Sequence, residues 1–210
     1  MKIAVVVHRY GPDTNGGPEL HGRYIAERLA AHADVRVLTT CARDYVTWRN
    51  ELPPGHDVVN GIPVERFPVA RERDVFEFSR RSEQCFEERH SIDHELRWLR
   101  SEGPTCPRLI RRLRRATGEF DFVLLFSVRY YHAYHGARAA PNAAVLVPTA
   151  EREASIGLSI FQPIFRGVRA IMYNSHEEQG LINPLSGNTH VPGVVHGVGW
   201  EGPLHTQPPP

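Results

Sequence analysis

The sequence has few cysteines, and this scarcity excludes a protein held together by disulfide bonds. Three cysteines occur among 210 residues, Cys41, Cys85 and Cys106, and they lie far apart without any Cys-x-x-Cys pair. An odd number of widely spaced cysteines is typical of reduced thiols in the cytosol. We therefore expect a cytoplasmic protein.

Long apolar runs and an excess of one charge are absent as well. No stretch approaches the ~20 apolar residues that a membrane span needs, and the opening run Ile3–Val7 is too short for the core of a signal peptide. Lysine and arginine number 25 against 24 aspartate and glutamate, which leaves a formal net charge of +1. The chain as a whole therefore has no field that would attract nucleic acid. The basic segment 108–115 leaves a peripheral membrane contact open, with an ordinary solvated helix face as the favoured alternative.

What the sequence does contain is a glycine-rich loop between its first apolar run and its first helical pattern. The loop reads Tyr-Gly-Pro-Asp-Thr-Asn-Gly-Gly-Pro-Glu over residues 10–19. Asn15, Gly16 and Gly17 can take backbone angles that other residues avoid. They would also let an anion approach free amides at the positive end of the helix dipole. The loop is thus a predicted phosphate or anion site, and a plain tight turn is the alternative.

The spacing within this loop argues against two common nucleotide sites. Gly11 and Gly16 have the spacing of a P-loop, but Gly17 and Pro18 stand where a P-loop has its lysine and its serine or threonine. The dinucleotide fingerprint Gly-x-Gly-x-x-Gly is absent, and the second apolar run, Val35–Leu38, is not followed by an acidic residue for the ribose. An NAD-type enzyme is therefore a disfavoured alternative.

Short apolar runs alternate with helical patterns along the chain. This alternation predicts a Rossmann-like α/β fold, with a mostly parallel sheet of about seven strands and helices on both faces. The expected strands are residues 3–7, 35–40, 62–69, 120–126, 143–147, 170–173 and 190–195. A helix interrupted at Pro163 is expected over residues 156–168. Residues 1–198 should form one domain, and residues 199–210, which end in Gln-Pro-Pro-Pro, a linker stub towards a missing second domain.

Ligands of such sheets bind outside the carboxyl ends of the strands, so the loops after strands carry the candidate site. Glu151 and Glu153, with Thr149 beside them, could bind the hydroxyl groups of a ligand, or they could simply favour a helix N-terminus. Arg129 and Tyr130 could form an aromatic and cationic wall for a ligand, or the half-buried start of a helix.

Two other groups have a plain structural interpretation. Asn174, Ser175 and Glu178 favour a helix cap over a ligand contact. His90 and His94 are spaced for a metal on one helix face, but without a third ligand nearby a solvated surface is the favoured interpretation. We expect neither a metal nor a cofactor.

Taken in order, these features resemble the N-terminal half of a retaining glycosyltransferase of the GT-B type, family four. The matching elements are the first strand, the glycine loop, a strand after the charged helical region, a strand-loop with an acidic residue downstream, and a closing segment close to the family's Pro-Asn-Gly-Val-Asp. They are Lys2–Val7, Asn15–Glu19, Phe120–Phe126, Ile171–Ser175 with Glu178, and Val194–Gly199. Each is modest alone, and their order and spacing are the specific part.

The resemblance implies transfer of a sugar from a nucleoside-diphosphate sugar to an acceptor hydroxyl with retention and without a metal. The acceptor, a small molecule, glycan or lipid, would bind to this domain, and its expected contacts are Arg129, Tyr130, Thr149, Glu151 and Glu153. A C-terminal domain would hold most of the donor. Gly16 and Gly17 would face the donor diphosphate. The family's histidine near the reacting sugar is absent from Ser127–Arg129 and Thr149–Glu151, so the catalytic residue is left unassigned, with Glu151 as a candidate.

By the same resemblance, this domain alone is expected to be nearly inactive. A second class of function stays open beside it: a non-catalytic module that binds a sugar or phosphate through the same loop.

Overall fold

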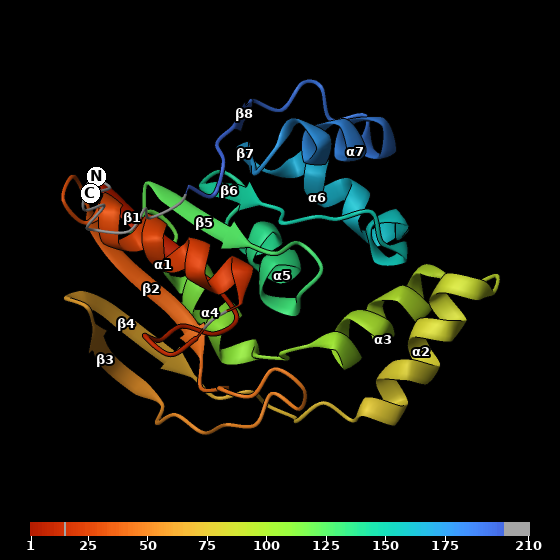
Figure 1. Ribbon diagram of the computed structural model, residues 1–210, viewed down its shortest axis with the longest axis horizontal. Helices are drawn as coiled ribbons and strands as arrows, with labels where there is room; N and C mark the ends of the chain where they lie inside the picture. Colours follow the sequence, from red (N-terminus) through yellow and green to blue (C-terminus); the bar gives the residue numbers. More distant parts are fainter. Residues whose placement is uncertain (15, 200–210) are drawn as a thin grey trace, which may run out of the picture.

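The computed structural model describes residues 1–14 and 16–199, and an eight-stranded sheet forms its centre (Figure 1). The strand order is β3-β4-β2-β1-β5-β6-β7-β8, and all neighbours are parallel except β3 with β4. The expected Rossmann-like α/β fold is therefore confirmed. The strands are β1 (Lys2–Val6), β2 (Asp34–Thr40), β3 (Gly55–Val59), β4 (Ile62–Phe67), β5 (Phe122–Phe126), β6 (Ala144–Val147), β7 (Ala170–Tyr173) and β8 (Gly193–Val195).

The sheet has one strand more than the sequence indicated, and the additional strand is β3. It forms an antiparallel hairpin with β4. Asn60 and Gly61 make the turn with φ angles of 50° and 79°, as a two-residue Asn-Gly turn requires. Four of the five β3 residues are not buried, because the strand lies at the edge of the sheet. An apolar pattern was therefore missing from this strand.

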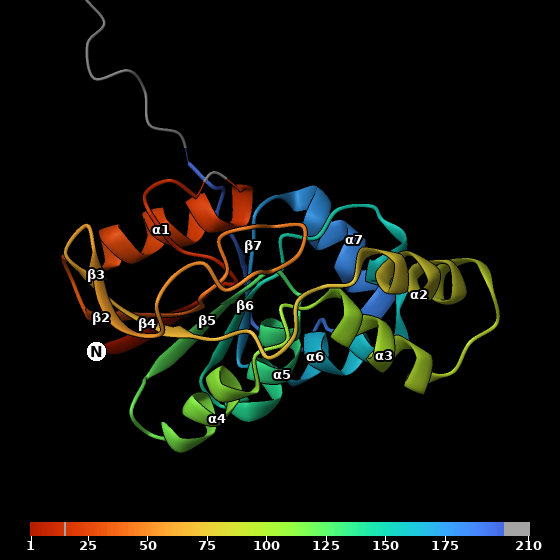
Figure 2. The ribbon, with the colours of Figure 1, turned by 90° about the horizontal axis from the view of Figure 1, so that it is seen from below.

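Helices cover both faces of the sheet, as predicted (Figure 2). α1 (Gly17–Leu29) packs on one face against β1 and β2, whereas α4, α5, α6 and α7 lie on the other. α2 and α3 pack against each other and extend away from the sheet (Figure 1). The bounds are α2 (Val75–Glu87), α3 (Ile92–Glu102), α4 (Pro107–Arg115), α5 (Tyr131–Ala139), α6 (Gln162–Gly167) and α7 (His176–Ser186).

The prediction of a helix over residues 156–168 was wrong in its first half. Two 3₁₀ turns, η1 (Ala154–Gly157) and η2 (Ser159–Phe161), come first, and α6 then begins with Pro163 in its first turn. Proline suits this position because the amide that it lacks would have no helical partner there. The proline therefore begins a helix instead of interrupting one.

The central strands are buried on both faces. Val5 and Val6 of β1 and Leu125 and Phe126 of β5 have no exposed surface, since two apolar cores lie against opposite sides of the sheet. Strands in this position are apolar throughout. This is why the sequence predicted β1 and β5 more clearly than the other strands.

The strand order produces a topological switch at the carboxyl ends of β1 and β5. From β1 the chain builds outward through β2 and β4, and it then returns to place β5 on the other side of β1. From β5 it continues outward through β6, β7 and β8. The loops after β1 and β5 diverge, and in open α/β sheets this is where a ligand crevice forms.

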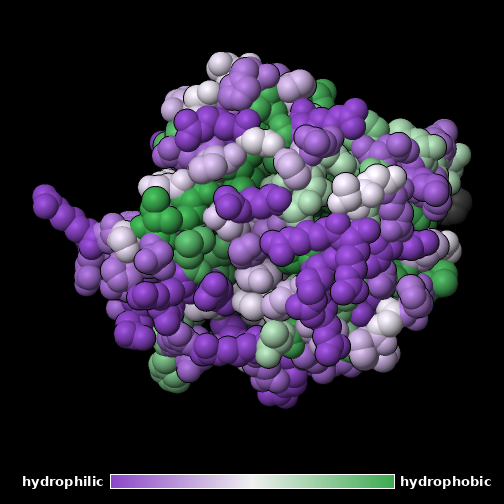
Figure 3. Space-filling model, turned by 180° about the vertical axis from the view of Figure 1, so that it is seen from behind, coloured by the Kyte–Doolittle hydropathy of each residue, from purple (hydrophilic) through white to green (hydrophobic). Residues whose placement is uncertain are grey.

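The surface opposite to the view of Figure 1 is mostly hydrophilic (Figure 3). On α4, Leu109 and Leu113 are buried, whereas Arg111 and Arg114 are exposed. The outward charge of α4 agrees with the plain interpretation of a solvated helix face. Within residues 1–14 and 16–199, no helix is both long and apolar enough to cross a bilayer.

Two glycine substitutions should change the stability of the fold in opposite directions. Gly103 has φ 74° and ψ −151°, a region almost reserved for glycine, and a Cβ there would lie 3.1 Å from Trp48. Gly180 lies inside α7, and a Cβ there would meet no atom within 4 Å, so alanine should favour the helix. We expect Gly103→Ala to destabilise by about 1–3 kcal/mol and Gly180→Ala to stabilise by about 0.5–1 kcal/mol. Urea unfolding measures both, and a Gly103→Ala protein as stable as the parent would contradict the first.

Candidate functional site

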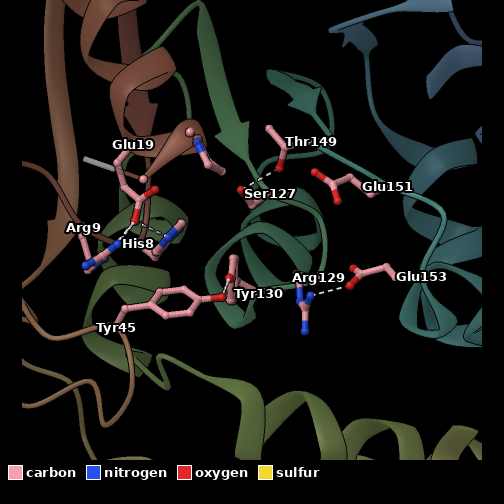
Figure 4. A pocket seen from close by; sticks show the side chains of 13 residues that line it. His8, Arg9, Glu19, Tyr45, Ser127, Arg129, Tyr130, Thr149, Glu151 and Glu153 are labelled. Atoms are coloured by element: carbon pink, nitrogen blue, oxygen red, sulfur yellow. Dashed lines mark hydrogen bonds and ion pairs between the residues drawn. The ribbon is translucent and has the colours of Figure 1, made fainter. Parts of the chain in front are cut away.

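A cavity of about 340 Å³ lies at the topological switch. It is formed by the loops that follow β1, β5 and β6, by the start of α1, and by one side chain from the long segment after β2 (Figure 4). We call it the first cavity. Its lining residues are His8, Arg9, Gly16, Gly17, Pro18, Glu19, Tyr45, Ser127, Arg129, Tyr130, Thr149, Glu151 and Glu153.

The structure brings together all the predicted site residues that it describes. Gly16 and Gly17 of the glycine loop and the predicted acceptor residues of two later loops line the same cavity. Asn15, the third residue of the predicted anion site, lies outside the described residues. Loops that are more than a hundred residues apart in the sequence thus meet at one edge of the sheet.

Gly16 and Gly17 do not use the unusual backbone angles that glycine permits. Gly16 has φ −74° and ψ 147°, an ordinary extended conformation, and Gly17 is not among the residues with positive φ. Gly16 instead lies directly against Glu19: a Cβ there would lie 2.0 Å from a carboxylate oxygen of Glu19, which would have to move. At Gly17 a Cβ would meet no atom within 4 Å. The fold therefore leaves the space in front of Gly17 open towards the cavity.

The N-terminus of α1 is already next to an anion, the carboxylate of Glu19. Glu19 is 3% exposed, and its Oε1 lies 2.9 Å from Nε2 of His8 and 2.8 Å from Nε of Arg9. Figure 4 shows the carboxylate between these two side chains. Burial acts to raise the pKa of Glu19, but the hydrogen bond and charge of His8 and the charge of Arg9 outweigh it and lower the pKa to about 2. Glu19 therefore stays ionised and fixes the end of β1 to the start of α1.

Backbone strain occurs at the ends of both strands that face the glycines. Ser127 follows β5 with φ 64°, and Thr149 lies two residues after β6 with φ 48°. The hydroxyl of Thr149 donates a hydrogen bond of 2.7 Å to the hydroxyl of Ser127. A left-handed backbone is rare for a β-branched residue, and such strain clusters at functional sites. Both hydroxyls lie at the cavity wall.

Arg129 is held rigidly beside the cavity by carboxylates. Its Nη1 donates a 2.6 Å hydrogen bond to Glu153, and its Nε faces the buried carboxylate of Glu102 at 2.8 Å, as an ion pair without hydrogen-bond alignment. Glu102 is also paired with Arg73, 2.7 Å away. Arg129 therefore serves mainly as a fixed part of the cavity wall, because its charge is already matched by two carboxylates.

Two tyrosines form the aromatic part of the wall. The hydroxyl groups of Tyr45 and Tyr130 lie 2.7 Å apart in a hydrogen bond, although 85 residues separate them in the sequence. Tyr130 is 5% exposed, and burial raises the pKa of its hydroxyl, which stays protonated. Tyr45 is 43% exposed and offers its ring to a ligand.

The side chain of Glu151 differs from the other carboxylates of the first cavity. It is exposed, and within the described residues it has no hydrogen-bond or ion-pair partner. Figure 4 shows it across the cavity from Glu19. With Glu19, Glu151 and Glu153 against Arg9 and Arg129, carboxylates outnumber guanidinium groups at the wall. Such a lining suits neutral hydroxyl groups better than a highly charged anion.

The predicted cap and the two histidines near the start of α3 are structural features. Ser175 accepts a 3.1 Å hydrogen bond from the amide of Glu178 at the start of α7, so the cap is confirmed. His94 belongs to a capping box with Ser91, and His90 lies 3.1 Å from Glu95. In the part of the chain that the structure describes, no three His, Cys, Asp or Glu side chains are grouped so as to hold a metal ion.

Several cavity residues were not identified as site residues from the sequence. His8 and Ser127 closely follow strands, so their position alone was a usable signal. Glu19 reads as an ordinary acid in a first helical turn. Tyr45 lies in an irregular segment and has no local pattern that would place it at the cavity. Glu102, which does not line the cavity but is paired with Arg129, lies at the end of a distant helix and has no such pattern either.

The comparisons with known proteins add no functional information to these observations. A scan against models of known protein families and a search of curated proteins both find no match. A functional assignment therefore rests on the residues and their geometry.

The Glu19 cluster should make the stability of the protein depend on acid pH. Because the pKa of Glu19 falls from 4.5 to about 2 on folding, its contribution is present above pH 4.5 and is lost as the pH falls towards 2. The full difference corresponds to about 3 kcal/mol. We expect Glu19→Gln to be less stable than the parent at pH 7, with the gap narrowing between pH 5 and pH 3 in urea unfolding. Parallel pH profiles for the two proteins would contradict this.

Proposed function

We propose that the chain is the acceptor-side, N-terminal domain of a retaining, nucleotide-sugar-dependent glycosyltransferase of GT-B family four. The observation that carries this proposal is the first cavity itself. A glycine at a helix start, two strand-end hydroxyls and an unpaired carboxylate face one space at the topological switch. These are the parts that a site needs to hold a hydroxyl-bearing acceptor beside a diphosphate.

The donor side of the proposed site is the start of α1. The first amides of a helix have no helical partner, and they lie at the positive end of the helix dipole. Because nothing fills the space in front of Gly17, a diphosphate can approach its backbone closely. Arg9 and Arg129 are already paired with carboxylates, so most of the charge that stabilises the leaving diphosphate would come from a second domain.

The acceptor side is formed by the loops after β5 and β6. Glu151 supplies a free carboxylate, Ser127 and Thr149 supply hydroxyl groups, and the ring of Tyr45 supplies an apolar surface. Hydrogen bonds from hydroxyl groups to an ionised carboxylate are among the stronger neutral-ligand contacts. This combination favours a polyhydroxylated acceptor.

In the proposed reaction, an acceptor oxygen bonds to the anomeric carbon while the bond from that carbon to the diphosphate breaks. The negative charge that develops on the diphosphate is stabilised by donors fixed before the reaction, and Gly17 contributes there. The leaving phosphate takes the acceptor's proton, so the chain needs no separate base. Glu151 would orient the acceptor hydroxyl through a hydrogen bond.

One observation favours a second candidate, a non-catalytic module that binds sugars. Both guanidinium groups of the first cavity are neutralised within the domain, and Glu19 occupies the helix N-terminus. Titration calorimetry with UDP, GDP and ADP sugars and with free sugars separates the two. Sugar transfer by the full-length protein supports the transferase, whereas sugar binding without any donor turnover supports the module.

The NAD-type alternative remains disfavoured. At the carboxyl end of β2, the hydroxyl of Thr40 donates a 2.6 Å hydrogen bond to the carbonyl of His8, and the next residues, Cys41 and Ala42, are buried. No acidic side chain directly follows β2 at the place where a ribose would bind. Tight binding of NAD in the same titration would reverse this order.

Substitution of Gly17 by valine should separate donor use from folding. A Cβ at Gly17 meets no atom, so we expect the variant to keep the stability of the parent within about 0.5 kcal/mol. The new side chain would block the approach of the diphosphate, and kcat/KM for transfer by the full-length protein should fall by about a hundredfold or more. Gly167→Val, also at an open glycine but at the end of α6, is the matched control. Unchanged turnover in Gly17→Val would show that the loop does not contact the donor.

Substitution of Glu151 by glutamine should affect the acceptor more than the donor. The amide has the shape of the carboxylate but loses its charge, and loss of a charge-assisted hydrogen bond is worth about 1.5–3 kcal/mol. We expect a tenfold or greater loss in kcat/KM for the acceptor, with donor hydrolysis nearly unchanged. Initial rates with and without acceptor measure this. An equal loss of both activities would contradict an acceptor role for Glu151.

A further inference from the structure

A second cavity, of about 290 Å³, lies beside the first. The two cavities share Gly17, Pro18, Thr149 and Glu151, and the second extends from them along the carboxyl ends of β6 and β7. Its floor includes His21 of α1 and Asn174 after β7. We call it the His21 cavity. Its volume is close to the roughly 300 Å³ at which ligand pockets begin, which is enough for one small ring.

His21 is a buried polar side chain without a partner. It is 1% exposed, and neither of its ring nitrogens has a hydrogen bond within the described residues. Its ring edge packs against Phe126, with 5.4 Å between the ring centroids. Burying a polar group without a partner costs stability, so such groups are rare and call for an explanation. A ligand in the cavity that His21 lines would supply the missing partner.

Asn174 supplies a second unpartnered group to the same cavity. Its side-chain oxygen is buried and has no hydrogen bond within the described residues. The backbone around it is fixed, because the carboxylate of Glu178 accepts 2.5 Å hydrogen bonds from the amides of Ala150 and Asn174. Glu178 thus ties the ends of β6 and β7 together, and both of its oxygens are used. Among the described residues that line this cavity, the buried side-chain atoms without a hydrogen-bond partner belong to His21 and Asn174.

The chemistry of these groups selects an uncharged ligand. Among the described residues that line the cavity there is no arginine or lysine, and there are two carboxylates, so the cavity disfavours phosphate. Burial and the nearby charge of His196 lower the pKa of His21 to about 4, so the imidazole is neutral at physiological pH. A neutral imidazole has one donor and one acceptor, which is also what an alcohol hydroxyl has. The amide oxygen of Asn174 can accept a hydrogen bond from a further hydroxyl group.

We propose that the His21 cavity binds an uncharged, hydroxyl-bearing ring, as a second sugar unit of the acceptor held in the first cavity. This inference rests on the proposed function for the unit in the first cavity. The acceptor class is then a neutral glycoside of two or more rings, since one ring cannot fill both cavities. Glu151, which lines both, would lie at the junction between the two units.

The test is direct binding, with the imidazole resonances of His21 observed by NMR. The probes are methyl glucoside, methyl mannoside and methyl galactoside, the disaccharides maltose, cellobiose and mannobiose, and glucose 6-phosphate as the charged comparison. We expect a neutral disaccharide to shift the His21 resonances saturably and to bind more tightly than its monosaccharide, while the phosphate does not shift them. Absence of any His21 shift with every neutral probe overturns the proposal and leaves the cavity to water.

Variants make the test sharper. His21→Leu removes an unpartnered imidazole, so it should unfold at a higher urea concentration than the parent and yet bind the disaccharide about tenfold more weakly. His21→Gln keeps a donor and an acceptor and should retain affinity within about threefold. His135→Leu is the matched control, because His135 also has a pKa lowered to about 4 by burial but lies on α5, between Tyr131 and Tyr134. Equal affinity of His21→Leu and the parent overturns the proposal.

This readout is independent of sugar transfer. His21-dependent sugar binding in a full-length protein that uses no nucleotide sugar would refute the transferase and leave this inference standing. Transfer that is lost in Gly17→Val but is the same in His21→Leu as in the parent would refute this inference and leave the transferase standing.

Discussion

The buried carboxylate of Glu19 is the interaction on which the geometry of the site depends. It joins the end of β1, through His8 and Arg9, to the first turn of α1, and it sits so close to Gly16 that a Cβ at that position would force the carboxylate to move. A buried charge of this kind is costly unless its partners are complete, and here an imidazole and a guanidinium complete it. The glycine loop is therefore held by a side chain and not by its own backbone angles. The strand and the helix it connects are fixed relative to each other at the point where the ligand crevice begins.

The opposite wall is fixed by different means. Ser127 and Thr149 hold left-handed backbone angles and share a hydrogen bond, and Arg129 is clamped between Glu102 and Glu153. Strained conformations persist only where the surroundings determine them fully. The two walls thus combine rigid polar groups with one free carboxylate and one exposed aromatic ring. A rigid frame with a few available groups is what orientation of a ligand requires.

The parts of the structure that the sequence revealed share one property, which is that a local pattern encodes them. Continuous apolar runs marked β1 and β5 because those strands are buried on both faces, and residues directly after strands marked most of the first cavity. β3 was missed because an edge strand needs no apolar face. The sequence could not predict three other features, because each depends on a contact between distant segments. These are the Glu19 cluster, the Tyr45–Tyr130 pair and the ion pairs of Arg129. His21 reads as a plain helix residue, and only its burial without partners singles it out.

The separation of these segments has a consequence for how the protein acquires its binding capacity. A hydrogen bond such as that between Tyr45 and Tyr130 spans 85 residues, and the first cavity exists only when the chain has returned to place β5 against β1. Closing such long loops is slow and comes late in folding. Partly folded forms should therefore have no affinity for the ligand, so the ligand stabilises the completed chain alone and raises its resistance to proteolysis by mass action. A ligand that fits the cavity would thus stabilise only the fully folded protein.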